Sequence, residues 1–142
     1  HTNDAAGGVT RLLDMGIEPF LVASSVLCFI AQRLVRVVCA DCAEPAPPNP
    51  QWREQFGLTQ LPPEFTRGQG CAACKNTGYK GRTAIYEFLP MTDAVHALIL
   101  KRASSQEIKQ AAVRDGMRTL RQDGWLKILP GFTTPEEVLR VS

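Results

Sequence analysis

Cys39-Ala40-Asp41-Cys42 opens the stretch of sequence that decides the fold, and Cys71-Ala72-Ala73-Cys74 closes it after an interval of 28 residues. A CxxC turn places two thiolates on the same side of a tight loop, so two such turns supply the four soft ligands of a tetrahedral Zn²⁺ site. The repeated motif therefore predicts a structural zinc site whose ligands are Cys39, Cys42, Cys71 and Cys74.

The residues around the second motif also fit a metal site. Gly70 and Gly78 flank it, and Lys75 follows it directly. Glycine lets backbone N–H groups turn toward sulfur, and a lysine offsets part of the negative charge of four thiolates. We therefore expect the two glycines to shape the turn and Lys75 to balance its charge.

Two other uses of paired cysteines fit less well. Disulfides suit small secreted scaffolds, whereas the first residues do not have the pattern of a signal peptide. A redox CxxC needs a thioredoxin-like βαβ setting and no second copy. The fifth cysteine, Cys28, lies in an apolar run and is predicted to be a buried thiol without a reactive role.

Length and composition set the class of protein. The 142 residues suffice for one domain or for part of a larger one, and 44% hydrophobic with 21% charged residues is ordinary for globular proteins. No apolar run approaches the ~20 residues of a membrane span, so no transmembrane segment is expected. The net charge of +2 is too small to indicate a nucleic-acid partner. Cysteines held by zinc fit a reducing cytoplasm.

The chain before the first motif is predicted to form two helices and a strand. Thr2, Asn3 or Asp4 can cap a first helix that ends near Gly16, and Pro19 stands in the first turn of a second. The β-branched, apolar run at residues 27–38 indicates a strand that is covered on both faces.

Polar side chains interrupt this strand at Gln32, Arg33 and Arg36. They indicate either an exposed strand end or a polar cluster that faces a ligand or a neighbouring subunit. The pattern alone leaves both interpretations open.

A second strand is expected at residues 81–89, directly after the cysteine segment. Residues 39 to about 80 are therefore predicted to form a zinc-stapled insertion at the tip of a β-hairpin, because so short a segment buries little core. Within it, the proline-rich residues 44–50 indicate a stiff extended linker, and a short helix is expected between Gln51 and Leu61.

The rest of the chain is predicted to be helical. Helix-capping signals stand at Thr92, Ser104 and Thr134, and a further helix is expected over residues 119–129. We expect these four helices to pack as a bundle behind the hairpin.

The sequence lacks the usual residues of a catalytic centre. It contains no G-x-x-x-x-G-K-[ST] phosphate loop, and its histidines, His1 and His96, form no constellation with a nucleophile. No catalytic residue is therefore predicted in this chain, and alone it is expected neither to bind ATP tightly nor to hydrolyse it.

Taken together, these stretches resemble the C-terminal end of the ATPases of type II secretion and type IV pilus assembly. The resemblance begins at His1-Thr2-Asn3-Asp4-Ala5, passes through Gln32-Arg33-Leu34-Val35-Arg36 and both cysteine motifs, and covers nearly the whole chain in order. Further matching stretches lie at residues 11–16, 19–25, 77–82, 85–87, 116–124 and 133–138. Ala84 stands where that family has glycine.

The resemblance implies an α/β fold that is the C-terminal fragment of a RecA-like P-loop ATPase domain. Residues 1–38 would then be the last part of that domain, residues 39–80 its tetracysteine zinc insertion, and residues 81–142 the returning strand and the C-terminal helical bundle. His1 would be the last residue of a histidine box, and His1, Gln32 and Arg33 would lie toward the nucleotide. The P-loop, the acidic boxes and the catalytic glutamate would lie upstream.

The same resemblance implies partners and location. ATP and Mg²⁺ would be cofactors of the full-length protein only, which would form a homo-hexamer. That hexamer would be cytoplasmic and would act on an inner-membrane secretion platform. We favour type II secretion over type IV pilus assembly, and motors of the pilus-retraction type lack the four cysteines. A free-standing zinc-binding interaction module is the alternative from another class.

Overall fold

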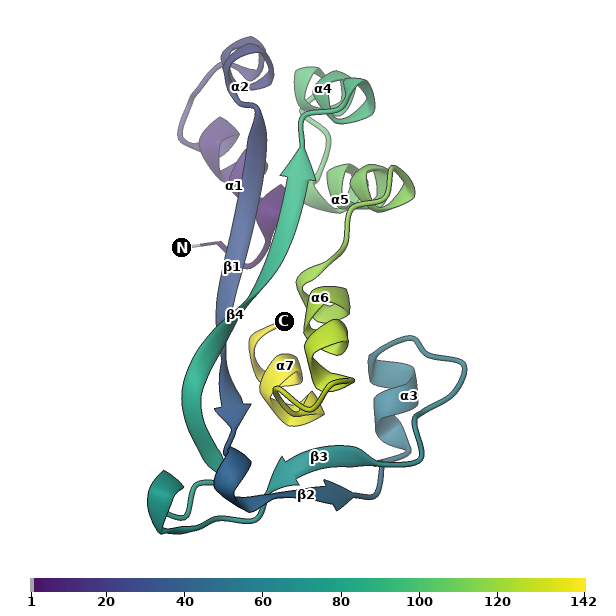
Figure 1. The fold of residues 1–142 in the computed structure, drawn as a ribbon. Helices are drawn as coiled ribbons and strands as arrows, with labels where there is room; N and C mark the ends of the chain where they lie inside the picture. The colour runs from purple at the N-terminus through teal and green to yellow at the C-terminus, as the bar shows by residue number, and fades with distance from the viewer. Residues whose placement is uncertain (1) are drawn as a thin grey trace. The chain divides into compact units, whose positions relative to one another are not determined.

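The computed structural model describes residues 2–142, and the chain divides into two compact units. The first unit comprises the chain up to Gln32 together with Tyr86–Leu120, and the second comprises Arg33–Ile85 with Arg121–Ser142. His1, a predicted nucleotide contact, lies outside the described residues. Strands β1 (Cys28–Val38) and β4 (Tyr79–Pro90) pair with each other and each contributes to both units (Figure 1).

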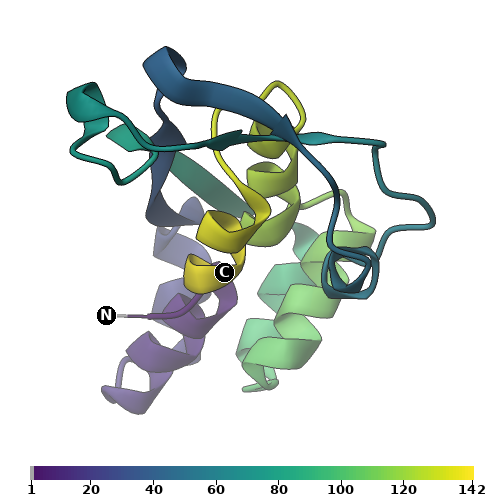
Figure 2. The same cartoon turned by 90° about the horizontal axis from the view of Figure 1, so that it is seen from below.

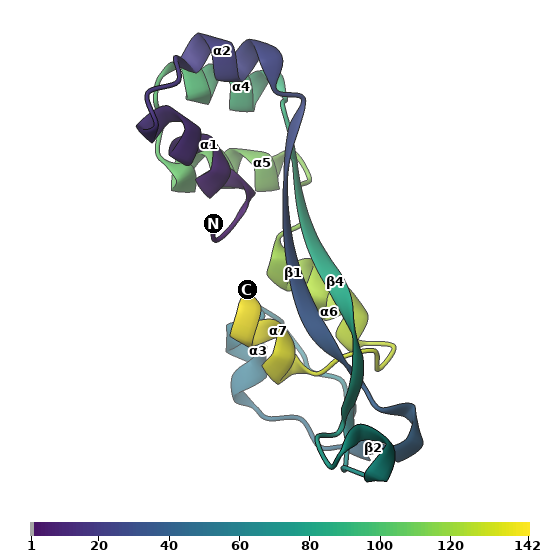
Figure 3. The same ribbon diagram turned by 90° about the vertical axis from the view of Figure 1, so that its left-hand side faces the viewer.

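The first unit is built from four helices beside one part of the hairpin (Figure 3). They are α1 (Ala5–Asp14), α2 (Pro19–Ser25), α4 (Asp93–Leu100) and α5 (Ser105–Arg114). Helix α1 contacts α5, α2 contacts α4, and α4 contacts α5. Their contacts enclose the fully buried side chains of Val9, Val95, Ile99 and Ile108. Of the three candidate caps of α1, Asp4 is the residue that caps the helix: its side chain accepts the Gly7 N–H at 2.8 Å.

A buried carboxylate on β4 organises this unit. Glu87 is fully buried and accepts backbone N–H groups from Ala5 at 3.0 Å and from Leu120 at 3.3 Å. Lys109 lies 3.9 Å from it and 2.8 Å from Asp4. Because a buried charge is tolerated only when it is paired, these contacts fix the start of α1 against β4 and α5.

The second unit contains the segment between the cysteine motifs. Strands β2 (Ala43–Ala46) and β3 (Phe65–Gly68) pair antiparallel, from Ala43 opposite Gly68 to Ala46 opposite Phe65 (Figure 2). Helix α3 (Gln51–Gln55) lies between them in sequence, and α6 (Leu120–Ile128) and α7 (Pro135–Val141) follow later. The expected helical bundle is therefore divided, with α4 and α5 in the first unit and α6 and α7 mainly in the second.

Two predictions about strands were wrong. The proline-rich stretch does not begin as a linker, because residues 44–46 belong to β2, where an edge position tolerates Pro45 without its N–H. Strand β1 is not covered on both faces within the described chain. Its buried Ala31 and Val35 alternate with Ile30 and Leu34, whose exposed fractions are 59% and 47%.

Aromatic side chains anchor α3 in the second unit. The ring centroids of Trp52 and Phe65 lie 5.1 Å apart, those of Phe65 and Trp125 5.8 Å, and those of Phe56 and Trp125 5.1 Å. Arg121 also donates to the Gln55 carbonyl at 3.0 Å. The cluster thus joins α3, β3 and α6.

A second buried carboxylate anchors α7. Glu137 accepts the Arg36 backbone N–H at 3.0 Å and the Arg36 guanidinium at 2.6 Å, and it pairs with Arg140 at 2.9 Å. Arg36 also stacks on Tyr79, 4.1 Å from the ring centroid. Burial acts to raise the pKa of Glu137, but the hydrogen bonds from Arg36 and Arg140 outweigh burial and lower this pKa to about 2.

None of the helices in residues 2–142 combines the length and the apolar character that crossing a membrane requires.

The Glu137 network predicts a pH-dependent stability. Glu137→Gln should lower the free energy of unfolding by about 2 kcal/mol at pH 7, less than for a fully buried pair, because Arg36 and Arg140 are 47% and 55% exposed. Since folding lowers the pKa of this carboxyl from 4.5 to about 2, the stabilisation is complete above pH 4.5 and is lost as the pH falls toward 2. Urea unfolding between pH 2 and 7 measures the difference between the two proteins.

The exposed neighbour Glu136 offers the matched control, and Glu136→Gln should change the free energy of unfolding by less than about 0.5 kcal/mol. A Glu137→Gln difference that stays constant down to pH 2 would contradict the ionic role of Glu137.

Candidate metal centre

The four predicted ligands come from the ends of strands and from two short turns. Cys39 directly follows β1, and the 3₁₀ turn Ala40–Cys42 carries the second cysteine of the first motif. The 3₁₀ turn Ala72–Cys74 comes shortly after β3 and carries the second cysteine of the second motif. The pairing of β2 with β3 brings these turns together, because Ala43 follows the first turn and lies opposite Gly68.

The sulfur geometry fits a tetrahedral metal site. The Sγ atoms of Cys39 and Cys71 lie 3.9 Å apart, those of Cys42 and Cys74 3.9 Å, and those of Cys71 and Cys74 3.7 Å. All four lie within 4.8 Å of one another. Zn–S bonds of about 2.3 Å in a tetrahedron separate sulfur atoms by about 3.8 Å. The structure therefore confirms that the four cysteines form one group that could hold a metal ion.

None of the five cysteines forms a disulfide, so the disulfide alternative has no support in the structure. Cys28 is outside the four-cysteine group, as predicted, although it is half-buried rather than buried.

Backbone N–H groups point at the sulfur atoms. Gly70 donates to Cys42 Sγ at 3.3 Å, and Gly78 and Cys71 each donate to Cys74 Sγ at 3.2 Å. Such bonds stabilise thiolates and orient them toward a metal. The predicted use of Gly70 and Gly78 is thus confirmed.

Burial and these hydrogen bonds act in opposite directions on the pKa values of the thiols. Burial raises the pKa of Cys42 to about 12 and also raises that of Cys39. Burial acts in the same direction on Cys74, but the N–H groups of Cys71 and Gly78 outweigh it and hold its pKa at about 6. The backbone N–H groups thus favour the thiolate form of Cys74, whereas burial disfavours the thiolates of Cys39 and Cys42, which a neighbouring cation would stabilise.

An ion pair lies at the rim of the sulfur group. Asp41 Oδ2 is 3.9 Å from Cys39 Sγ, and Lys80 lies 3.4 Å from the same carboxylate. The position of Lys80 could not be predicted from the sequence, because most of the insertion separates it from the first motif. The charge-balancing role of Lys75 stays a prediction.

Two glycines let the backbones cross beside the candidate metal ligands. A Cβ atom on Gly68 would lie 2.0 Å from the Gly78 carbonyl oxygen, far inside contact distance. That oxygen accepts the Cys39 N–H at 2.9 Å, so the crossing joins the two motifs. Sequence analysis missed Gly68, since only the path of the chain shows that it meets Gly78.

Of the three predicted nucleotide contacts, Gln32 and Arg33 lie within the described residues. Gln32 is exposed and Arg33 is half-buried, and as successive residues of β1 they point to opposite faces. The guanidinium of Arg36, the third polar residue of that strand, pairs with Glu137. The roles of Gln32 and Arg33 therefore stay predictions.

The chain is similar to known proteins along nearly its whole length. A family described as "Type II/IV secretion system protein" matches residues 1–140. The chain is 47% identical to type II secretion system protein E of Pseudomonas aeruginosa, covering 100% of the chain and 28% of that relative. It is 46% identical to type IV pilus assembly ATPase PilB of Thermus thermophilus, covering 98% and 16%. Type II secretion system ATPase E of Vibrio cholerae is 45% identical, with 28% of its length covered. The chain thus spans less than a third of these relatives.

The sulfur geometry predicts one zinc ion per purified chain, measured by elemental analysis. Cys42→Ser or Cys74→Ser should abolish stoichiometric binding, because each removes one of four ligands. Cys28→Ser is the matched control and should keep the metal. Absence of stoichiometric metal, or a requirement for Cys28 or His96, would contradict this ligand set.

Removal of the metal should have a local effect on hydrogen exchange. Chelation should expose the amides of residues 39–43 and 68–78, which are held around the sulfur atoms. Helix α3 should keep partial protection because its aromatic contacts do not involve the metal. Loss of protection throughout the chain would mean that the metal supports the core of both units.

The glycine crossing predicts that Gly68→Ala weakens zinc binding about tenfold or more, because the new Cβ displaces the Gly78 carbonyl that orients Cys39. Competition with a chromophoric chelator measures this affinity. Gly81→Ala is the comparison: Gly81 has φ +82° but open space around it, so its substitution should cost about 1 kcal/mol of stability and leave zinc affinity unchanged. Equal zinc affinity in the two variants would show that the crossing does not matter.

Proposed function

Because the chain belongs to the type II/IV secretion system protein family, we propose that it is the zinc-binding region of a hexameric ATPase that powers type II protein secretion. The observation that carries the proposal is the four-cysteine group within a chain that matches secretion ATPases along its whole length. The proposed metal is zinc, because four cysteine thiolates select it over oxygen-preferring cations.

The proposed role of the metal is structural. Four protein sulfur atoms leave no open position for water or substrate, so a bound zinc ion would supply only cross-links and positive charge. The N–H donors of Gly70 and Gly78 orient Cys42 and Cys74, and the two N–H groups that donate to Cys74 favour its thiolate form.

The proposed motor extends beyond this chain. Relatives called ATPases are longer by several-fold, and the chain itself contains no P-loop motif. ATP and Mg²⁺ would therefore be bound by other parts of the full-length protein, with His1, Gln32 and Arg33 nearest to the nucleotide. The hexamer would work in the cytoplasm against a platform at the inner membrane.

Assembly of a type IV pilus is the second candidate function. It is favoured by matches of nearly the same identity, 46% to the pilus assembly ATPases of Thermus thermophilus and Myxococcus xanthus. Complementation of a strain that lacks either the secretion ATPase or the pilus assembly ATPase by the full-length gene separates the two. A start codon at the beginning of this chain would instead favour a free-standing zinc module.

We assign the metal-locked segment to transmission of motion rather than to phosphate chemistry. Cys74 is linked to Gly78 by a hydrogen bond, and the next residue, Tyr79, stacks with Arg36 and bonds Thr134 at 2.9 Å. Within the second unit, the metal group is therefore connected to α7 by short polar contacts. A rigid connection of this kind suits force transfer to a partner.

In the full-length hexamer, Cys39→Ser and Cys71→Ser should reduce secretion much further than basal ATP turnover, because the metal supports the coupling segment. Both activities are measured on the same preparations, and Cys28→Ser is the control for loss of a cysteine. If secretion and turnover fall in proportion to the amount of folded protein, the metal is only a structural cross-link and the coupling role is wrong.

A further inference from the structure

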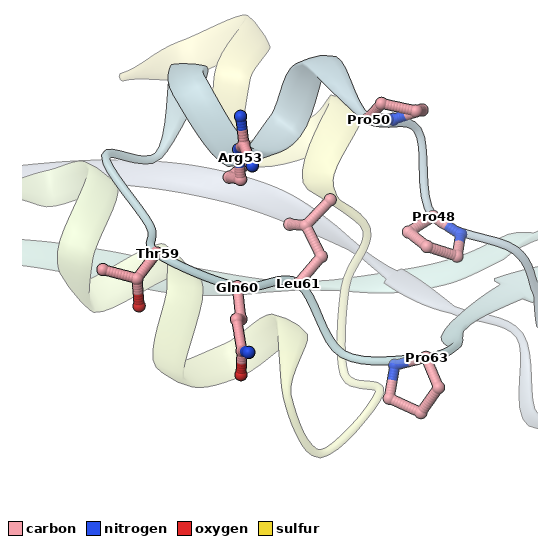
Figure 4. A pocket seen from close by; sticks show the side chains of 7 residues that line it. All are labelled: Pro48, Pro50, Arg53, Thr59, Gln60, Leu61 and Pro63. Carbon is pink, nitrogen blue, oxygen red and sulfur yellow. The ribbon is translucent and has the colours of Figure 1, made fainter.

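A hollow of about 660 Å³ lies beside α3. None of the four cysteines is among the residues that line it. Its walls are Pro48, Pro50, Arg53, Thr59, Gln60, Leu61 and Pro63. Figure 4 shows Leu61 extending toward α3, between Arg53 and the prolines before the helix, while Gln60 extends from the other side of the same loop. The volume is in the range of binding sites for small ligands and for one or two side chains of a peptide.

The walls of this hollow are held in place before any ligand binds. Each proline has a fixed φ angle, so the two loops lose little further freedom on binding. Helix α3 is anchored by the contact of Trp52 with Phe65 and by that of Phe56 with Trp125. The hollow is therefore formed by the fold and does not depend on a partner to shape it.

A single cation stands at its edge without a partner. The Arg53 side chain is exposed and makes no hydrogen bond or ion pair with any residue in the described part of the chain. It contrasts with Arg36, Arg67 and Arg140, each of which pairs with a glutamate in the same unit. An apolar hollow bordered by one free guanidinium complements an apolar group that lies next to an anion.

We propose that this hollow binds an extended segment of a partner protein in which an apolar side chain stands next to a carboxylate. The apolar side chain enters between Leu61 and the prolines, and the carboxylate pairs with Arg53. The inference goes beyond the proposed metal-locked region, because it assigns a second surface of the same unit to partner recognition by chemistry that the sulfur group does not supply.

The test is an NMR titration of the isotopically labelled, zinc-loaded chain with the peptide acetyl-Gly-Phe-Asp-Gly-amide. Amide shifts should be concentrated in residues 48–63. A matched peptide with Asn in place of Asp should bind about threefold more weakly, as expected for an exposed ion pair. A peptide with Ser in place of Phe should bind at least about tenfold more weakly, because it loses the buried apolar group.

Arg53→Gln should make the Asp and Asn peptides bind equally, whereas Arg82→Gln, which removes another exposed arginine of this unit, should leave the difference unchanged. Leu61→Ser should weaken the binding of both peptides.

The proposal is wrong if the preference for Asp survives Arg53→Gln, if Arg82→Gln removes this preference too, or if the amide shifts lie outside residues 48–63. Concentration-dependent shifts in residues 48–63 without peptide would instead identify a second copy of the chain as the occupant and overturn the proposal. Zinc content, measured on each sample, tests the metal centre separately.

Discussion

The crowding of four cysteine sulfur atoms within 4.8 Å of one another is the constraint on which the segment between β1 and β4 depends. Four thiolates this close repel one another, and four thiols are only weak hydrogen-bonding partners. A bound dication would remove both difficulties at once. The strands between the motifs have four residues each and α3 has five, too few to bury a core alone. A metal ion held by the four cysteines would therefore supply what hydrophobic burial in this segment cannot.

Within each unit, one buried carboxylate meets a comparable need: Glu87 at the start of α1 in the first unit, and Glu137 in α7 in the second. Glu87 takes N–H groups from Ala5 and Leu120 in the first unit, and Glu137 takes the Arg36 N–H in the second. Each satisfies backbone donors that are distant in sequence, and each would be costly to bury without those partners. In each unit, polar contacts at the end of a helix thus add to the packing of the apolar side chains.

Local signals in the sequence predicted the four-cysteine group and the helix starts, because a CxxC turn or a capping residue acts within a few positions. The caps at Ser104 and Thr134 form as expected. What the sequence did not reveal depends on contacts between distant segments. Strand β2 contains a proline and is only four residues long, and Trp125 meets Phe65 across 60 residues of sequence. The burial of Glu137 likewise could not be predicted from its neighbours in sequence, because it depends on the ion pair with the distant Arg36.

With a metal bound, the short β2–β3 ladder would be held at its two ends by different forces. At one end Ala43 pairs with Gly68 next to the sulfur group, and at the other Ala46 pairs with Phe65 in the aromatic cluster. Metal ligation is sensitive to chelators and acid, whereas aromatic packing is not. Loss of the metal would therefore release the cysteine turns and leave the hollow beside α3 in place. The two surfaces of this unit are physically separable, so one can be altered without abolishing the other.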